Sequence, residues 1–306
     1  MVQLEILCCG ELTIDEISEA GSISGEGSLK LSSTGRFFGG RGGNASVYAS
    51  MFGVSVGIMG AVGEEIGGQE YVKHLISEMV DVENLYYNKK AHTNKCFIFN
   101  GQEGSKIFFY GGALLEEREP YLEHLSSRIA KIEHRMLYST SPDPEVNYIL
   151  LKNSEAGIKC FGPSSNIYSY LKKEAEACLG NSDILFLNED EGEFLERLLQ
   201  KKMQEIIKEF NLKFIVKTLG NRGGEIIAED SVLKIPPYEA SGVIDTSGAG
   251  DAFAGAFMAN YYKTEDLPYS GNIASATASF VVEQAGCQSR MPTREEIFER
   301  MKKRII

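Results

Sequence analysis

A short run of small and acidic residues near the carboxyl end of the chain has the composition of a reactive loop. Gly248, Ala249 and Gly250 stand before Asp251, and small apolar residues follow. This pattern predicts a tight loop that opens a buried helix. Unpaired backbone N–H groups and the helix dipole allow such a loop to hold an anion, most often phosphate. Asp251 would lie in the first helical turn, where a carboxylate can take a proton from an attacking hydroxyl.

A simpler interpretation is that Asp251 only caps the helix and that the glycines serve packing. For a lone Gly-x-Gly-Asp this simpler interpretation is the commoner one. Other parts of the chain must therefore decide between a cap and a catalytic loop.

Two further polar clusters follow apolar runs that predict strands. Asn188 and Glu191 enclose two more acids, a set that suits a hydrated Mg²⁺, although an acidic helix start would look the same. Thr218, Gly220 and Gly223 follow the run Phe-Ile-Val-Lys and suit a nucleotide phosphate or ribose, although a simple turn also would. In an open parallel sheet, ligands bind at the carboxyl ends of the strands, which is where both clusters fall.

A glycine-rich segment, residues 39–44, precedes a helical stretch that Gly53 closes. Asn44 is expected to cap that helix, and Arg41 and Gly43 lie in the loop before it. The segment resembles a phosphate cradle, but it lacks the Lys-Ser/Thr ending of a P-loop. No strand leads directly into it, so it does not fit a dinucleotide fingerprint. A nicotinamide-dependent oxidoreductase is therefore disfavoured.

Strand-like and helix-like runs alternate from residue 136 onward, which predicts a mostly parallel sheet with helices on both faces. The expected strands are 4–9, 54–59, 136–140, 157–161, 184–188, 214–218 and 232–235; the expected helices are 45–52, 69–79, 145–153, 168–178, 189–199, 203–210, 252–262, 273–282 and 293–301. Two hairpin regions, about 11–40 and 92–112, interrupt this rhythm and predict a small second sheet. No linker separates independent domains, so we expect one α/β domain over residues 1–306.

Composition limits the partners. The 306 residues are 43% hydrophobic, enough for a sizeable core, and carry a net charge of -12. This charge argues against nucleic acid or an anionic membrane surface as the main partner. No apolar run reaches about 18 residues, and the first ten residues read as a buried strand, not as a signal peptide. Six scattered cysteines without a C-x-x-C pair suggest reduced thiols and a cytoplasmic location.

Taken together, these motifs resemble those of the ribokinase, or PfkB, carbohydrate kinase family. The stretch 245–253, Asp-Thr-Ser-Gly-Ala-Gly-Asp-Ala-Phe, is similar to the specific carboxy-terminal signature of that family, and residues 39–44 are similar to its amino-terminal signature. Residues 188–191 match its Asn-x-x-Glu motif, residues 218–223 its Thr-Leu-Gly-x-x-Gly turn, and residues 286–294 its closing segment. The resemblance covers nearly the whole chain and implies a ribokinase-like fold.

The resemblance also implies roles for the matched residues in transfer of the ATP γ-phosphate to an alcohol. Asp251 would be the general base, with the backbone of Gly248, Ala249 and Gly250 forming the anion hole. The remaining roles are ATP binding for Asn188, Thr218, Gly220 and Gly223, organisation of Mg²⁺ waters for Glu191, and acceptor binding for Asp15, Gly43 and Asn44. Some relatives bind a monovalent cation such as K⁺ in the region that matches Asp245 and Ser247. The hairpins would form a lid that excludes water, through which the family often makes a homodimer.

Two departures leave the acceptor open. Many relatives have Gly-Ala-Asn where this chain has Gly-Ala-Leu at 112–114. Arg41, Arg36, Lys95 and Lys106 fall in or near the acceptor region, and a neutral sugar does not need them, although solvated lid charges are the simpler explanation. We therefore expect a kinase for a sugar or nucleoside. The alternatives are a kinase for an acidic or already phosphorylated alcohol, of the sugar-phosphate or mevalonate-phosphate type, and a non-catalytic nucleotide-binding protein.

Overall fold

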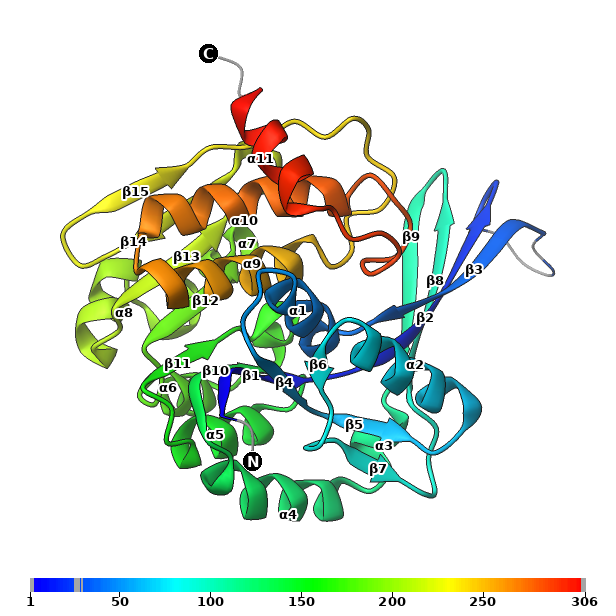
Figure 1. Cartoon of the computed structure of the whole chain (residues 1–306), viewed down its shortest axis with the longest axis horizontal. Coiled ribbons are helices and arrows are strands. Elements are labelled where there is room, and N and C mark those ends of the chain that lie inside the picture. Colours follow the sequence, from blue (N-terminus) through cyan, green and yellow to red (C-terminus); the bar gives the residue numbers. More distant parts are fainter. Residues whose placement is uncertain (1–2, 25–27, 29, 304–306) are drawn as a thin grey trace.

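The computed structural model describes residues 3–24, 28 and 30–303 and shows a large sheet between two helical layers (Figure 1). The nine strands follow the order β15-β14-β13-β12-β11-β10-β1-β4-β6; the pairs β13–β14 and β14–β15 are antiparallel, and the other neighbouring pairs are parallel. Their bounds are β1 (Leu4–Gly10), β4 (Val56–Met59), β6 (Val80–Asp81), β10 (His134–Thr140), β11 (Ile158–Phe161), β12 (Ile184–Asn188), β13 (Phe214–Thr218), β14 (Gly224–Ile227) and β15 (Val232–Ile235). The mostly parallel α/β architecture predicted from the sequence, with helices on both faces of the sheet, is confirmed.

Strand residues alternate between two cores because successive side chains of a strand point to opposite faces. In β12, Ile184 and Phe186 join one core, whereas Leu185 and Leu187 join the other. The first core packs against α1 (Arg41–Ser50), α2 (Ile66–Ser77), α9 (Ala249–Thr264), α10 (Leu267–Val281) and α11 (Arg294–Lys302). The second packs against α3 (Gly112–Leu115), α4 (Arg118–Arg128), α5 (Pro144–Asn153), α6 (Lys172–Leu179), α7 (Glu189–Leu199) and α8 (Met203–Phe210).

Helices α1 and α9 pack closely on the first face, and Gly255 marks the contact. A Cβ at Gly255 would overlap the carbonyl oxygen of Ala45, so only glycine lets the two helices approach this far. The contact lies less than two turns beyond the start of α9 and so fixes where that start lies relative to α1.

A second sheet projects from the side of the body (Figure 1). Its order is β3-β2-β8-β9, in which β2–β3 and β8–β9 are antiparallel pairs and β2 runs parallel to β8. The strands are β2 (Thr13–Ala20), β3 (Leu31–Gly39), β8 (Asn94–Gly101) and β9 (Gly104–Tyr110); a two-stranded sheet, β5 (Ala61–Gly63) with β7 (Tyr86–Asn88), lies below. The expected first hairpin also includes residues 25–27 and 29, which lie outside the described residues.

Two of the differences from the sequence-based expectations have a clear cause in the backbone. Asn44 is not the cap of α1, because the helix already begins at Arg41 after Gly40, whose φ of 87° favours glycine. The expected helix 168–178 is split into a 3-10 turn, Ser164–Ser169, and α6, since Tyr170 and Leu171 adopt extended backbone conformations between them.

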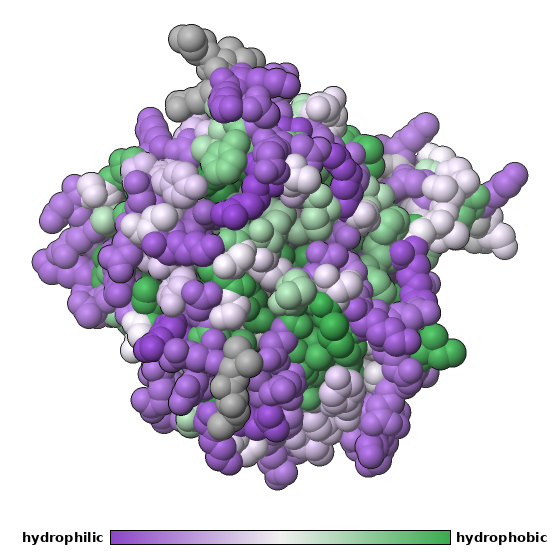
Figure 2. Space-filling model, in the orientation of Figure 1, coloured by the Kyte–Doolittle hydropathy of each residue, from purple (hydrophilic) through white to green (hydrophobic). Residues whose placement is uncertain are grey.

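The surface fits the acidic composition. The face in Figure 2 is mostly hydrophilic, with apolar side chains gathered near its centre. Among the described residues, no helix is long and apolar enough to cross a membrane.

Candidate active site

The start of α9 is a helix end without a side-chain cap among the described residues. Gly248 precedes the helix with φ of 77°, and no side chain of the described residues caps it. A Cβ at Gly248 would overlap the sulfur of Cys287, so both the turn and its packing require glycine. First-turn amides without a side-chain cap are suited to an anion. The loop that contains Ala249 and Gly250 therefore has the physical features of a phosphate site.

Asp251 lies in the first turn of α9, and its carboxylate is held by a neighbour from α1. Nδ2 of Asn44 donates a hydrogen bond to Oδ2 of Asp251 at 2.9 Å. Loss of solvent raises the pKa of Asp251 to about 7; the Asn44 hydrogen bond and Arg41 oppose this rise, whereas Glu11 and Glu191 add to it. A carboxylate whose pKa lies near neutrality is suited to accept a proton during a reaction.

Arg41 is fixed by a buried ion pair. Its Nε lies 2.5 Å from Oε1 of Glu11, and its Nη1 donates to the carbonyl oxygen of Pro163 at 3.1 Å. Turning the amide of Asn166 would bring a further acceptor to the guanidinium. Oε2 of Glu11 has no hydrogen-bond partner among the described residues and is buried. Arg41 is thus paired with a carboxylate within the protein. Its positive charge still lowers the pKa of Asp251.

The remaining cations of the acceptor region also have partners. Arg36 pairs with Glu70 at 3.3 Å, and Lys95 pairs with Glu16 at 3.5 Å. Nζ of Lys106 donates to the carbonyl oxygen of Ile23 at 2.9 Å. A cavity of about 540 Å³ between the second sheet and α2 is lined by Ile14, Glu16, Arg36, Glu64, Glu65, Ile66, Gly67, Gln69, His92 and Lys95. Its lining therefore holds both signs of charge.

Asp15 stands on β2 and faces the start of α1. Its Oδ1 accepts a hydrogen bond from the hydroxyl of Thr13 at 2.6 Å. Burial raises the pKa of Asp15 to about 6, and Asp245 contributes to the rise. A Cβ at Gly39 would overlap the carboxylate of Asp15, and one at Gly43 would overlap the hydroxyl of Tyr71. The glycines of the first signature thus admit polar side chains close to the backbone.

The cluster at the end of β12 caps a helix. Oδ1 of Asn188 accepts from the backbone N–H of Glu191 at 2.8 Å, and Oε2 of Glu191 accepts from the N–H of Asn188 at 2.9 Å. This reciprocal cap of α7 is the simpler of the two interpretations given above. It uses one oxygen of Glu191, so the other remains for a further ligand. Burial raises the pKa of Glu191.

The turn after β13 lies beside this cap. Thr218 is in register with Asn188 on the neighbouring strand, so both side chains lie at the same edge of the sheet. Gly220 and Gly223 have φ of 59° and 86°, values that favour glycine. An ion pair between Arg222 and Glu189 joins the turn to the start of α7. The two clusters therefore form one surface.

Asp245 connects two loops. Its Oδ1 accepts from the N–H of Ser247 at 2.9 Å, and its Oδ2 accepts from the N–H of Gly286 at 3.1 Å. These bonds give Asp245 a structural role in the approach to α9. Among the described residues, no group of three or more His, Cys, Asp or Glu side chains is placed to hold a metal ion.

Three residues around Asp251 had not been singled out from the sequence: Glu11, Tyr71 and Gln288. Gln288 lies in the segment 286–294 that resembles the closing segment of ribokinases, a signal that points to it. Glu11 follows β1 directly, where polar residues at a strand end deserve notice. Tyr71 carries no such signal, because it lies within an ordinary amphipathic helix.

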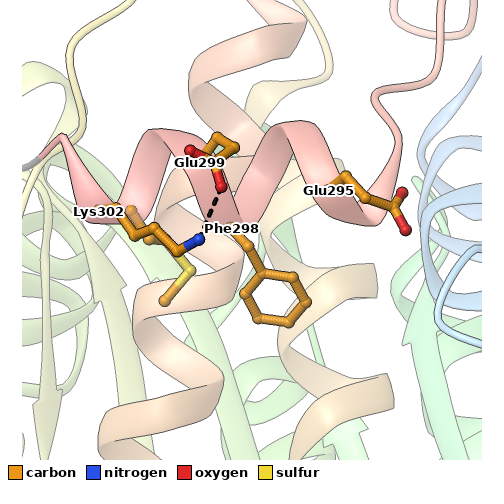
Figure 3. Close-up of a pocket in the computed structure, with 5 residues that line it drawn as sticks. Glu295, Phe298, Glu299 and Lys302 are labelled. Atoms are coloured by element: carbon orange, nitrogen blue, oxygen red, sulfur yellow. Dashed lines mark hydrogen bonds and ion pairs between the residues drawn. The ribbon is translucent and has the colours of Figure 1, made fainter.

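A second cavity, of about 490 Å³, lies on α11. It is lined by Glu295, Phe298, Glu299, Met301 and Lys302, and Figure 3 shows these side chains on that single helix, with Glu299 paired to Lys302. None of the residues considered above contributes to it.

Known proteins give the fold and the site a family. The family model of the pfkB carbohydrate kinases matches residues 3–294. A nucleoside kinase of Methanocaldococcus jannaschii is 28% identical over 305 residues, covering 99% of this chain and 98% of its own. A nucleoside kinase of Methanothermobacter thermautotrophicus is 31% identical over 271 residues, covering 86% and 84%. The crystal structure of the M. jannaschii enzyme superimposes with a TM-score of 0.89, at 27% identity and 99% coverage of both chains.

The chain belongs to the PfkB family of carbohydrate kinases. It is a phosphotransferase that uses a hydroxyl group as acceptor, as the kinases named among its relatives are.

Proposed function

We propose that this chain transfers the γ-phosphate of ATP to a hydroxyl of a neutral nucleoside or sugar, with Asp251 as general base. The observation that carries this proposal is the position of Asp251 in the first turn of the uncapped α9, with a pKa near 7. There, the carboxylate can take the proton of the attacking hydroxyl while the amides of Gly248, Ala249 and Gly250 hold the transferred phosphate.

In this proposal, ATP and the acceptor bind on opposite sides of Asp251. Asp15, Gly43 and Asn44 lie toward the second sheet, and we assign them to the acceptor's hydroxyls, with Arg41 as a fixed charge beside them. We assign Asn188, Thr218, Gly220 and Gly223 to ATP, because they form one surface at the ends of β12 and β13. In this arrangement, Asp251 and the start of α9 separate donor from acceptor.

A neutral acceptor is favoured because the candidate cations are already paired. Arg41, Arg36 and Lys95 each face a carboxylate, so the charge of each cation is balanced within the protein before any acceptor binds. Two relatives that are named nucleoside kinases support a nucleoside over a free sugar. An acidic or phosphorylated alcohol is the weaker candidate, and a non-catalytic role is disfavoured by the intact loop and base.

Magnesium and a monovalent cation belong to this proposal as well. Mg²⁺ prefers few direct carboxylates and keeps its waters, which fits the one remaining oxygen of Glu191 beside a nucleotide phosphate. Bound there, it would neutralise charge on the phosphates. For K⁺ at Asp245 and Ser247 the support is less, since both carboxylate oxygens of Asp245 already accept backbone N–H groups.

The second sheet would act as a lid on a single domain that spans residues 1–306. Its edge strand β9 exposes Ile107, Phe108 and Phe109, an apolar row that would suit a second copy of the chain. Closure would exclude water from the transferred phosphate and thereby suppress ATP hydrolysis.

A panel of acceptors tests the function. ADP formation is to be measured with Mg²⁺-ATP and purine and pyrimidine nucleosides, ribose, fructose, a sugar phosphate and a phosphorylated alcohol. We expect turnover with neutral nucleosides or sugars. Turnover confined to the anionic acceptors would overturn the assignment of a neutral acceptor while leaving the kinase chemistry intact.

A further inference from the structure

A buried glutamine connects the site to helix α2 and to the second sheet. The side chain of Gln288 is 7% exposed, and its Nε2 donates to Oδ1 of Asn44 at 2.8 Å and to the hydroxyl of Tyr71 at 3.0 Å. Its Oε1 lies 2.9 Å from Nε2 of His74. The hydroxyl of Tyr71 in turn donates to the carbonyl oxygen of Gly39, at the end of β3, at 2.5 Å. Gln288 thus joins three elements in one hydrogen-bonded chain.

The carbonyl oxygen of Gly39 determines which group donates and which accepts in each hydrogen bond of this network. The carbonyl oxygen of Gly39 can only accept, so Tyr71 donates its single proton there and offers a lone pair to Gln288. Gln288 must then direct its amide N–H groups toward Tyr71 and Asn44, and its oxygen toward His74, which carries a proton on Nε2. The backbone carbonyl of Gly39 in the second sheet therefore determines how the amide of Gln288 is oriented.

Asn44 needs such a partner because its amide has two orientations of nearly the same shape. In one, Nδ2 faces Asp251 and stabilises the carboxylate; in the other, Oδ1 faces the carboxylate and repels it. Packing alone does not distinguish them. A donor opposite Oδ1 does, and Gln288 provides that donor.

We propose that Gln288 is a positioning residue for phosphotransfer, which locks the amide of Asn44 so that its N–H groups face Asp251. The proposal rests on the proposed role of Asp251 and adds to it the residue that controls its neighbour. Gln288 does not touch the reacting atoms and acts through Asn44.

Gln288 is hydrogen-bonded to Asn44, Tyr71 and His74, and not to the charged groups that face Asp251, which are Arg41 from α1, Glu11 after β1 and Glu191 from α7. Tyr71, Tyr138 and Cys287 also face Asp251 and are neutral, and Tyr71 keeps its proton on the carbonyl oxygen of Gly39 when Gln288 is replaced. A change in the titration of Asp251 in such variants would therefore report on Asn44.

Two replacements of Gln288 test the proposal through the pH dependence of kcat/KM. Gln288→Met keeps the length of the side chain and removes its donor, so the acid limb should move upward by about half a pH unit. Gln288→Glu offers only acceptors and forces the Asn44 amide to turn, so the limb should move by about one unit or more. KM for ATP should not change. Gln284→Glu, four residues before Gln288 and only half-buried, is the matched control; its Nε2 donates to the carbonyl oxygen of Arg290 and not to Asn44, so this variant should leave the limb in place.

An unmoved acid limb in a folded Gln288→Met enzyme would overturn the proposal, and so would a movement seen with Gln288→Glu alone, since added charge would then explain it.

A second measurement does not depend on catalysis. Gln288→Met should lower the thermal unfolding temperature of the free protein more at pH 8, where Asp251 is ionised, than at pH 4. This difference between the two pH values should vanish in an Asp251→Asn background. Equal weakening at both pH values would indicate a merely structural glutamine. If Asp251→Asn left turnover intact, the proposed function would fail, while the unfolding measurement would still decide the role of Gln288.

Discussion

The amide nitrogen of Asn44 lies 2.9 Å from a carboxylate oxygen of Asp251, although 207 positions separate the two residues in the chain. The contact joins the first turns of α1 and α9, which carry the two glycine-rich signatures. Its energy depends on the charge of Asp251, because a hydrogen bond to a carboxylate is stronger than one to a neutral acid. Protonation, folding and catalysis are therefore linked at this contact.

Replacement of Asp251 by Asn should abolish most of the turnover. A general base contributes about 10²- to 10⁴-fold, so acceptor-dependent ADP formation should fall by that factor while ATP still binds. The measurement is the initial rate with the best acceptor, together with ATP binding by calorimetry. An unchanged rate would exclude Asp251 as the base.

The activity should decline in acid with an apparent pKa near 7. Asp251 must be ionised to accept a proton, and its pKa is raised to about 7, so kcat/KM should fall about tenfold per pH unit below that value. A pH profile of kcat/KM with saturating Mg²⁺ checks this. A limb near pH 4 would mean that the site is more open to water than the structure indicates.

Replacement of Glu11 should move the acid limb of the kcat/KM pH profile in a defined direction. Its negative charge contributes to the raised pKa of Asp251, so Glu11→Gln should move the acid limb to lower pH. Arg41 keeps its charge in this variant and should act more strongly on Asp251. A shift to higher pH would contradict the charge arrangement around Asp251.

Asp251→Asn should also stabilise the free protein above pH 7. The pKa of Asp251 is higher in the folded protein than in the unfolded chain, so the folded state loses stability as the pH rises from about 4 to about 7. Asparagine cannot ionise and avoids this loss. Denaturant unfolding should give a gain of about 1–2 kcal/mol at pH 8, after allowance for partial solvation, and no gain at pH 4. A gain that is equal at both pH values would reject the linkage.

The ion pair between Arg41 and Glu11 should be costly to break from one side only. Arg41→Met leaves the buried carboxylate without its cation and should lower the free energy of unfolding by about 3–5 kcal/mol. The double variant Arg41→Met with Glu11→Leu should recover part of that loss. If the two losses simply add in a double-mutant cycle, the pair does not act as a unit.

Gly248→Ala should damage both folding and turnover. The residue has φ of 77°, where an L side chain is strained by about 1–2 kcal/mol, and its Cβ would overlap Cys287. Gly242→Ala is the matched control, because a Cβ there meets nothing within 4 Å. Thermal melting and the rate of ADP formation should separate the two variants clearly.

The parallel sheet could be predicted because its signal is local. Runs such as 184–188, 214–218 and 232–235 are apolar, bounded by polar turns, and agree with the observed strands to the residue. Helix starts were less well predicted where the backbone itself decides. Gly40 caps α1 four residues before the expected cap, Asn44, because a positive φ and not a side chain ends the preceding loop.

The site was predictable only as a set of separate clusters. The sequence indicates which residues end each strand, and it does not indicate which side chains meet. The partners Glu11 for Arg41 and Gln288 for Asn44 lie 30 and 244 positions away, and no spacing rule relates them. The carboxylate partner of Arg41 could not be predicted from the sequence, and it weighs against recognition of an anionic acceptor by Arg41.

The glycine contact between α1 and α9 has a consequence for the tuning of the enzyme. A larger residue at Gly255 would wedge the two helices apart about one turn below Asp251, and a hydrogen bond of 2.9 Å does not tolerate such a displacement. The wedge would touch no substrate, yet it would weaken the donor that keeps Asp251 ionised. The pH range over which this kinase is active therefore depends partly on how closely α1 and α9 pack. A search for variants adapted to acid or alkali should accordingly include residues that do not contact a ligand.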